Sequence, residues 1–337
     1  EDSAILGALV RAAEMGKQVQ VLVEVKARFD EEANLRWAGR LEQAGVQVIY
    51  SMRGLKVHAK LAMVVRREDG ELRPYAYLAT GNFNERTARQ YVDLGLLTAD
   101  PRLTTEVQTV FRYLAGEEAE PTFEHLLVAP FNMREELYRL MEDESLAARE
   151  GRESGILAKM NALEDEQVIQ HMWEAEADGV PIDLVVRGIC CMKPRPGGNL
   201  RIRSIVDRYL EHWRGWVFHA AGEERMYLGS ADWMYRNLSN RVEVVFPLYD
   251  PDVRRQVRQA LEIQLRDNVK ARVLDGSLRN RYVTRRHGEP VFRAQEETRR
   301  HYQRLVRRGG EPPAVATPGE ASRSATSATS TAGGGSS

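Results

Sequence analysis

Residues 54–65 have the sequence GLKVHAKLAMVV, in which a histidine and a lysine interrupt an otherwise apolar run. The apolar and β-branched residues predict a strand. Because successive side chains of a strand point to opposite faces, His58 and Lys60 would lie on the same face. We therefore expect one face of this strand to line a cleft and the other to pack against the core.

The order of polar residues around this strand occurs twice in the chain. In each half, a predicted strand ends in an arginine, Arg28 or Arg187, and a later strand carries a histidine, His58 or His212. A third predicted strand ends in a glycine followed by a small polar residue, in TGNFN and in LGSAD. Because the spacings differ, we interpret the two halves as diverged copies of one unit.

Predicted strands and helices alternate along most of the chain, which is typical of α/β proteins. The sequence opens with an amphipathic helix, so we expect the first copy to lack its first strand, which would lie upstream. We expect two α/β/α domains with mixed sheets, at residues 1–122 and 123–306. Residues 307–337 are rich in Ser, Thr, Ala and Gly, which predicts a disordered tail.

Composition limits the classes of function. The net charge is −1, so a site for a polyanion has to be a local cluster of cations. No apolar run approaches the roughly 20 residues of a membrane span, and no signal peptide is evident, although peripheral membrane association stays open. The two cysteines, Cys190 and Cys191, are adjacent and suit neither a structural disulfide nor a metal site. These features predict a cytoplasmic protein.

The residue types of the repeated pattern are suited to phosphoryl transfer. Imidazole is a competent nucleophile near neutral pH because its pKa is about 6.5. Lysine and arginine neutralise phosphoryl oxygens, and Asn82, on a glycine turn, adds a neutral donor. A lone strand histidine is usually a satisfied polar group, but the neighbouring Lys60 and the duplication favour a functional role for His58. The basic stretch at residues 279–287 fits either a solvated face or a channel for a polyanion.

The pattern H-x-K followed by G-[NS]-x-N resembles the signature of the phospholipase D superfamily, present in two copies. That superfamily usually has an aspartate seven residues after the histidine, where this chain has Val65. In the second copy, Arg214 and His219 stand at the lysine and aspartate positions. These departures argue against an ordinary phosphodiesterase.

Longer strings resemble the C-terminal half of the bacterial polyphosphate kinases, from about Ala4 to about Arg304. They are VEVKARFDEEANLRWAGRLEQAGV, LKVHAKL, TGNFNERTARQYVDLGLLTAD, VRGICC, IVDRYLEH and GSADWMYRNLSNRVEV. The resemblance implies two phospholipase D-like domains that transfer the terminal phosphate of ATP reversibly to polyphosphate, with Mg²⁺ as cofactor. It implies ATP, ADP and polyphosphate as partners, a homo-oligomer in the full-length enzyme, and no nucleic acid partner.

The resemblance also implies roles for individual residues. His58 would be the phosphorylated histidine, with Lys60 and His212 completing the catalytic set and Arg28 helping to hold magnesium. The substrate-binding residues would be Tyr91, Arg187, His212, Asn82 and Asp93. Two alternatives stay open: a phosphodiesterase or nuclease of the phospholipase D superfamily, and a non-catalytic fragment that binds polyphosphate.

Overall fold

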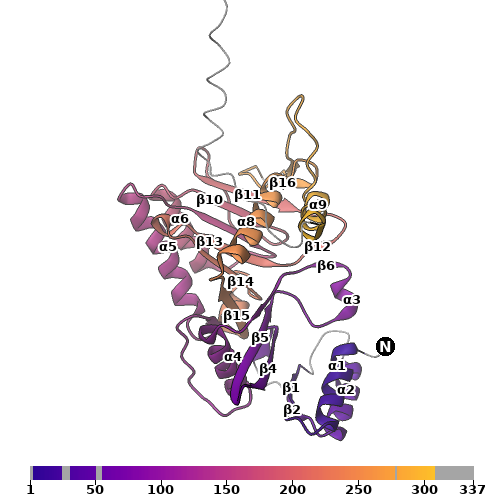
Figure 1. The fold of residues 1–337 in the computed structure, drawn as a ribbon. Helices are drawn as coiled ribbons and strands as arrows, with labels where there is room; N and C mark the ends of the chain where they lie inside the picture. The colour runs from indigo at the N-terminus through magenta and orange to yellow at the C-terminus, as the bar shows by residue number, and fades with distance from the viewer. Residues whose placement is uncertain (1–2, 25–30, 51–54, 278, 308–337) are drawn as a thin grey trace, which may run out of the picture.

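The computed structural model describes residues 3–24, 31–50, 55–277 and 279–307, and Figure 1 shows their arrangement. Parallel and antiparallel strands are combined with helices, so the predicted mixed α/β architecture is confirmed. Arg28, the first strand expected upstream of Glu1 and nearly all of the predicted tail lie outside the described residues. No helix in the described ranges is both long and apolar enough to cross a membrane.

The first part of the chain, indigo to purple in Figure 1, contains two small sheets. β1 and β2 form a parallel pair, and β4, β5 and β7 form an antiparallel sheet. The elements are α1 (Ala4–Glu14), β1 (Gln20–Val23), α2 (Glu31–Gln43), β2 (Gln47–Tyr50), β3 (Lys56–Val57), β4 (Leu61–Glu68), β5 (Glu71–Ala79), α3 (Glu85–Ala88), β6 (Tyr91–Val92), β7 (Gly95–Thr98) and α4 (Pro101–Leu114).

The second part is built on a large mixed sheet with the strand order β17-β16-β11-β10-β9-β13-β14-β15-β3, in which β8 also pairs with β15. Its elements are β8 (Leu127–Ala129), α5 (Met133–Arg149), β9 (Ile156–Met160), α6 (Glu166–Ala177), β10 (Ile182–Val186), β11 (Leu200–Ile205), β12 (Leu210–Glu211), β13 (Arg214–Phe218), the 3₁₀ turn η1 (Ala220–Gly222), β14 (Arg225–Gly229), α7 (Tyr235–Ser239), β15 (Arg241–Pro247), α8 (Pro251–Leu265), β16 (Ala271–Val273), β17 (Arg281–Tyr282) and α9 (Ala294–Arg307).

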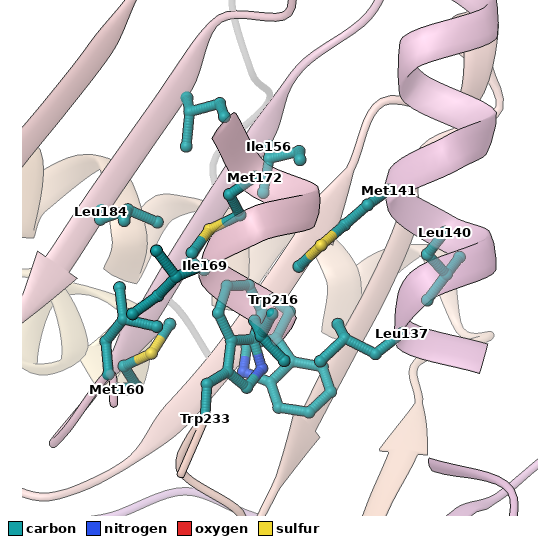
Figure 2. Close-up of a cluster of buried hydrophobic side chains, with 14 of the residues drawn as sticks. Leu137, Leu140, Met141, Ile156, Met160, Ile169, Met172, Leu184, Trp216 and Trp233 are labelled. Atoms are coloured by element: carbon teal, nitrogen blue, oxygen red, sulfur yellow. The ribbon is translucent and has the colours of Figure 1, made fainter. Parts of the chain in front are cut away.

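Both faces of the large sheet are buried, which explains the nearly continuous apolar runs of its strands. On one face, α5 and α6 pack over Trp216 and Trp233, whose ring centroids are 5.3 Å apart (Figure 2). Val217, next to Trp216 in β13, points to the other face and joins a second apolar cluster. That cluster also contains residues of α4, α8 and β5, such as Leu78. The two parts of the chain therefore share a core.

A buried carboxylate fixes the turn after α8 and the start of α9. Asp267 is fully buried. Its Oδ1 accepts hydrogen bonds from the backbone N–H groups of Val269 (2.9 Å), Lys270 (2.6 Å) and Ala271 (2.8 Å), and its Oδ2 accepts one from Ala294 (2.6 Å). Asp267 thus connects two segments that are far apart in the sequence.

Replacing this carboxylate is expected to destabilise the fold. Asp267→Ala leaves four backbone N–H groups without an acceptor, so the free energy of unfolding should fall by about 3 kcal/mol. Asp267→Asn keeps one acceptor oxygen and should lose less. Urea denaturation of the two variants beside the wild type measures the difference. An Asp267→Ala protein as stable as the wild type would contradict this account of the turn.

Candidate active site

His58 lies in a break between β3 and β4, so the prediction of one continuous strand through GLKVHAKLAMVV is wrong at this residue. The backbone N–H groups of His58 and Ala59 both donate to the carbonyl oxygen of Val242, at 2.8 and 3.0 Å. Two successive donors on one acceptor interrupt the regular ladder. Because β3 pairs with β15 at Val57, the histidine of the first copy is held by a strand of the second.

His212 has the same local structure with the two copies exchanged. It lies between β12 and β13, and the N–H groups of His212 and Trp213 both donate to Val92, at 3.2 and 2.9 Å. β12 pairs with β6 of the first part, and the two strands lie side by side in Figure 1. Each histidine is therefore anchored on a strand of the other copy, and the two sites have the same arrangement with the roles of the copies reversed.

Each imidazole also pairs with an acid from the other copy. His58 Nδ1 lies 2.8 Å from Glu243 Oε2, and His212 Nδ1 lies 2.8 Å from Asp93 Oδ1. An ionised carboxylate can only accept hydrogen bonds, so Nδ1 of each ring donates. Nε2 then keeps its lone pair, which is the state that a nucleophile or a general base needs.

Glu243 was not predicted from the sequence, because the two copies were compared through their glycines. The structure aligns them two residues differently: the N–H of Thr80 donates to Leu94, and the N–H of Ser230 donates to Val244. The hydroxyl of Thr80 donates to Asp93 at 2.7 Å, and the hydroxyl of Ser230 donates to Glu243. A hydroxyl residue followed 13 positions later by an acid, with a valine directly before the acid, is a signal that could have identified Glu243.

Lys60 and Arg214 are equivalent cations, two residues after each histidine. The ammonium group of Lys60 donates to the carbonyl of His58, and the guanidinium of Arg214 donates to the carbonyl of His212 at 2.8 Å. They differ in their counter-ions, because Arg214 also forms an ion pair with Asp232 at 3.0 Å. Only 4% of Lys60 is exposed, and burial lowers the pKa of Lys60 to about 7.

The other predicted residues fall into three groups. Arg187, after β10, donates to Asn161 Oδ1 at 2.8 Å, and Asn161 Nδ2 donates to the carbonyl of His212 at 2.9 Å. The ring of Tyr91 lies 5.0 Å from that of His212. Asn82 is on an exposed turn, where no hydrogen bond joins its side chain to either histidine within the described residues. Arg28 lies outside the described residues.

A pocket of about 510 Å³ opens beside Arg187. Arg272 lines it, together with Asn280 of the basic stretch at residues 279–287. Val206 and Leu274 also line it, so the lining combines cationic, polar and apolar side chains.

Burial controls the charge of both histidines. Burial lowers the pKa of His58 below 6.5, although the carboxylate of Glu243 acts in the opposite direction. The pKa of His212 is lowered for the same reason, against the effect of Asp93. Burial alone would raise the pKa of Glu243, but His58 and Lys60 hold it below its usual value. Near pH 7, the site therefore contains neutral imidazoles and an ionised glutamate.

No group of three His, Cys, Asp or Glu side chains suited to a metal ion occurs among the residues that the structure describes. The carboxylates nearest the histidines, Asp93 and Glu243, already accept hydrogen bonds from them.

The fold and the site define an α/β protein with two histidine–acid pairs in one buried, cation-lined centre. In each pair, the histidine comes from one copy and the acid from the other. Residues 1–120 match the sequence model of the family described as polyphosphate kinase C-terminal domain 1, and residues 126–295 match that of C-terminal domain 2. The chain belongs to the polyphosphate kinase family.

Individual relatives agree with this assignment. The chain is 48% identical over 288 residues to polyphosphate kinase of Escherichia coli K12, covering 85% of this chain and 42% of the relative. It is 44% identical over 297 residues to polyphosphate kinase of Halalkalibacterium halodurans, covering 87% and 42%. The crystal structure of polyphosphate kinase from Porphyromonas gingivalis matches with a TM-score of 0.85 and 45% identity, over 91% of this chain and 47% of that one. The chain spans less than half the length of these relatives.

Proposed function

We propose that this protein carries the catalytic centre of an ATP–polyphosphate phosphotransferase that works through a phosphohistidine at His58. The observation that carries the proposal is the His58–Glu243 pair, which presents a neutral imidazole with a free Nε2. In the forward direction, Nε2 attacks the terminal phosphorus of ATP, the Nε2–P bond forms, and the bridging P–O bond breaks to release ADP. A terminal oxygen of polyphosphate then attacks the same phosphorus, and the Nε2–P bond breaks. The reverse sequence makes ATP.

The other residues of the site supply charge and position in this proposal. Lys60 and Arg187 bind the non-bridging oxygens, where negative charge is concentrated during transfer. Glu243 keeps the His58 ring in one tautomer. His212, paired with Asp93, either protonates the leaving oxygen or binds a phosphate, and Tyr91 packs against it. Asn82 is the least supported of the predicted residues, because its side chain forms no hydrogen bond with this centre among the described residues.

Magnesium belongs to the proposal as part of the nucleotide complex. Mg²⁺ is usually held by substrate phosphates and one or two carboxylates, and it would supply charge neutralisation there. Because a guanidinium group has no available lone pair, Arg28 would act on phosphate oxygens and not as a metal ligand. The proposal also includes the division into domains at residues 1–122 and 123–306, a homo-oligomeric full-length enzyme and a cytoplasmic location. The matches of the two family models support the division.

The proposal is tested with the full-length gene product in both directions. Incubation with ADP and polyphosphate should yield ATP, and incubation with ATP and a short polyphosphate should lengthen the chain. Hydrolysis of bis(p-nitrophenyl) phosphate without added metal, in place of transfer, would instead support the phosphodiesterase. Binding of polyphosphate with neither activity would support the non-catalytic fragment.

The proposed activity should depend on pH through Lys60 and His58. Lys60 is charged below its pKa of about 7, so kcat/KM should fall as pH rises through about 7 and the ammonium loses its proton. His58 must be neutral to attack, and its pKa lies below 6.5, so the acid limb should lie below pH 6.5. Lys60→Arg keeps its charge and should remove the alkaline limb near pH 7. A profile of Lys60→Arg that superimposes on that of the wild type would contradict the assignment.

A further inference from the structure

Asn161 directly follows β9, and all of its polar groups form hydrogen bonds. Its backbone N–H donates to Asp232 Oδ1 at 2.7 Å, and its carbonyl oxygen accepts from the N–H of Gly188 at 2.9 Å. Its side-chain Oδ1 accepts from Nε of Arg187 at 2.8 Å, and its Nδ2 donates to the carbonyl of His212 at 2.9 Å. This residue, which is only 6% exposed, therefore connects three segments of the centre.

The orientation of the Asn161 carboxamide is fixed by its two neighbours. A guanidinium group can only donate hydrogen bonds, and a carbonyl oxygen can only accept them. The amide oxygen must therefore face Arg187, and the NH₂ group must face His212. Among side chains of this size, aspartate lacks the donor and leucine lacks both groups. The link between the arginine and the histidine backbone thus depends on an asparagine.

The backbone holds Asn161 in place independently of its side chain. β9 pairs with β10 on one side and with β13 on the other, and the backbone hydrogen bonds of Asn161 follow directly after these ladders. The carbonyl of His212 also keeps a second donor, Nη1 of Arg214 at 2.8 Å. Removal of the carboxamide should therefore leave the strands intact and change mainly the contacts of the Arg187 guanidinium.

The contact at Nε determines which part of the Arg187 guanidinium is left for a ligand. Arg187 is half-buried and lines the pocket of about 510 Å³. Within the described ranges, no protein group accepts a hydrogen bond from its terminal nitrogens, Nη1 and Nη2. These two nitrogens lie side by side in the planar group, so they can bind two oxygens of one anion.

We propose that Asn161 is a positioning residue, which ties the guanidinium of Arg187 to the backbone of His212 and so presents Nη1 and Nη2 as a pair to the phosphates of the substrate. This inference rests on the proposed function and extends it to a residue that the sequence pattern did not single out. A free arginine side chain loses rotamer freedom when it binds a ligand, and the tie to Asn161 reduces that cost in advance. Asn161 acts through Arg187.

The test is a double-mutant cycle on the affinity for inorganic tripolyphosphate, measured by titration calorimetry. The full-length gene product carries His58→Gln throughout, so that no covalent transfer takes place. Asn161→Ala and Arg187→Ala are added to this background singly and together. Asn199→Ala is the matched control, because the exposed Asn199 also donates to a backbone carbonyl, but beside the start of β10, at the opposite end of that strand from Arg187. Thermal unfolding shows that the proteins compared are folded.

Arg187→Ala should weaken binding at least about tenfold, as expected for the loss of charge-assisted hydrogen bonds, and Asn161→Ala about fivefold, as expected for one ordering hydrogen bond. Because Asn161 acts through Arg187, the double variant should bind as Arg187→Ala does, within about twofold. Asn199→Ala should bind as the background does. Unchanged affinity of a folded Asn161→Ala protein overturns the proposal. Losses that multiply in the double variant also overturn it, because a general weakening of the fold would give that result.

Two further arms keep the test decisive. If Asn161→Ala does not fold, Asn161→Leu, which fills the space of the carboxamide, replaces it in the cycle with the same expected coupling. Coupling in a protein that carries out no ATP–polyphosphate transfer with His58 present would support the positioning role and reject the proposed function. Transfer by the wild type together with losses that multiply would reject the positioning role alone.

Discussion

A full-length gene product with His58→Ala is expected to take up no phosphate from γ-labelled ATP, and its rate of ATP–polyphosphate transfer should fall by about 10⁴-fold or more. The reason is that no other side chain of the centre, among the residues that the structure describes, is an equivalent nucleophile. Nε2 of His58 has its lone pair free because Nδ1 donates to Glu243, 2.8 Å away. At the other histidine of the centre, His212, Nε2 lies 3.2 Å from Nη1 of Arg214, from which it can accept a hydrogen bond, so its lone pair is not free. The label on the wild-type protein should be lost in acid and kept in base, as expected for a phosphorus–nitrogen bond.

Two further histidine variants serve as controls for this experiment. His212→Ala should slow transfer but still allow the protein to be labelled, because His58 and Glu243 are intact. His125→Ala should behave as the wild type, because His125 lies outside the centre and contacts Tyr249. Label that survives His58→Ala, or label that is stable in acid, would contradict the phosphohistidine assignment.

Glu243→Gln is expected to lower the transfer rate by about 10²- to 10⁴-fold, with the loss mainly in kcat. The glutamine amide is neutral, and its NH₂ group can face Nδ1, so the tautomer with Nε2 free is no longer fixed. The substitution also removes a negative charge from a fully buried position between His58 and Lys60. Steady-state kinetics of transfer measure the effect.

The pH profile separates this electrostatic role from a purely structural one. The carboxylate of Glu243 raises the pKa of both His58 and Lys60, so its loss should lower both values. Both limbs of the profile should then move to lower pH, with the optimum below that of the wild type. Glu243→Asp keeps the charge and should restore the position of the limbs, even where the rate stays reduced. A rate within threefold of the wild type, or a slow variant with an unshifted profile, would contradict the assigned role.

The α/β architecture could be predicted from the sequence, because it depends on local patterns. Apolar runs, helix caps and glycine turns predicted the order of strands and helices around His58 and His212. The expected continuous strand through His58 failed for a non-local reason. The carbonyl of Val242, more than 180 positions away in the chain, accepts two successive N–H groups and stops the ladder.

The sequence indicated most of the side chains that the structure brings together around His58 and His212, but not which of them form pairs. Residue types and order indicated His58, Lys60, Arg187 and His212, and the resemblance added Tyr91 and Asp93. Glu243 escaped notice because it is 185 residues from His58, and only the exchange of strands between the two copies brings them together. The lowered pKa of Lys60 arises from its burial, which no local pattern of residues indicates.

The most direct test of the account is the position of the phosphate on the imidazole ring. The phosphoprotein formed from ATP in the absence of polyphosphate is digested at alkaline pH, and tandem mass spectrometry with phosphorus NMR locates the group. Because Nδ1 of His58 is engaged with Glu243, the account predicts phosphate on Nε2 of His58. Phosphate on Nδ1 of His58, or on any other residue, would contradict it.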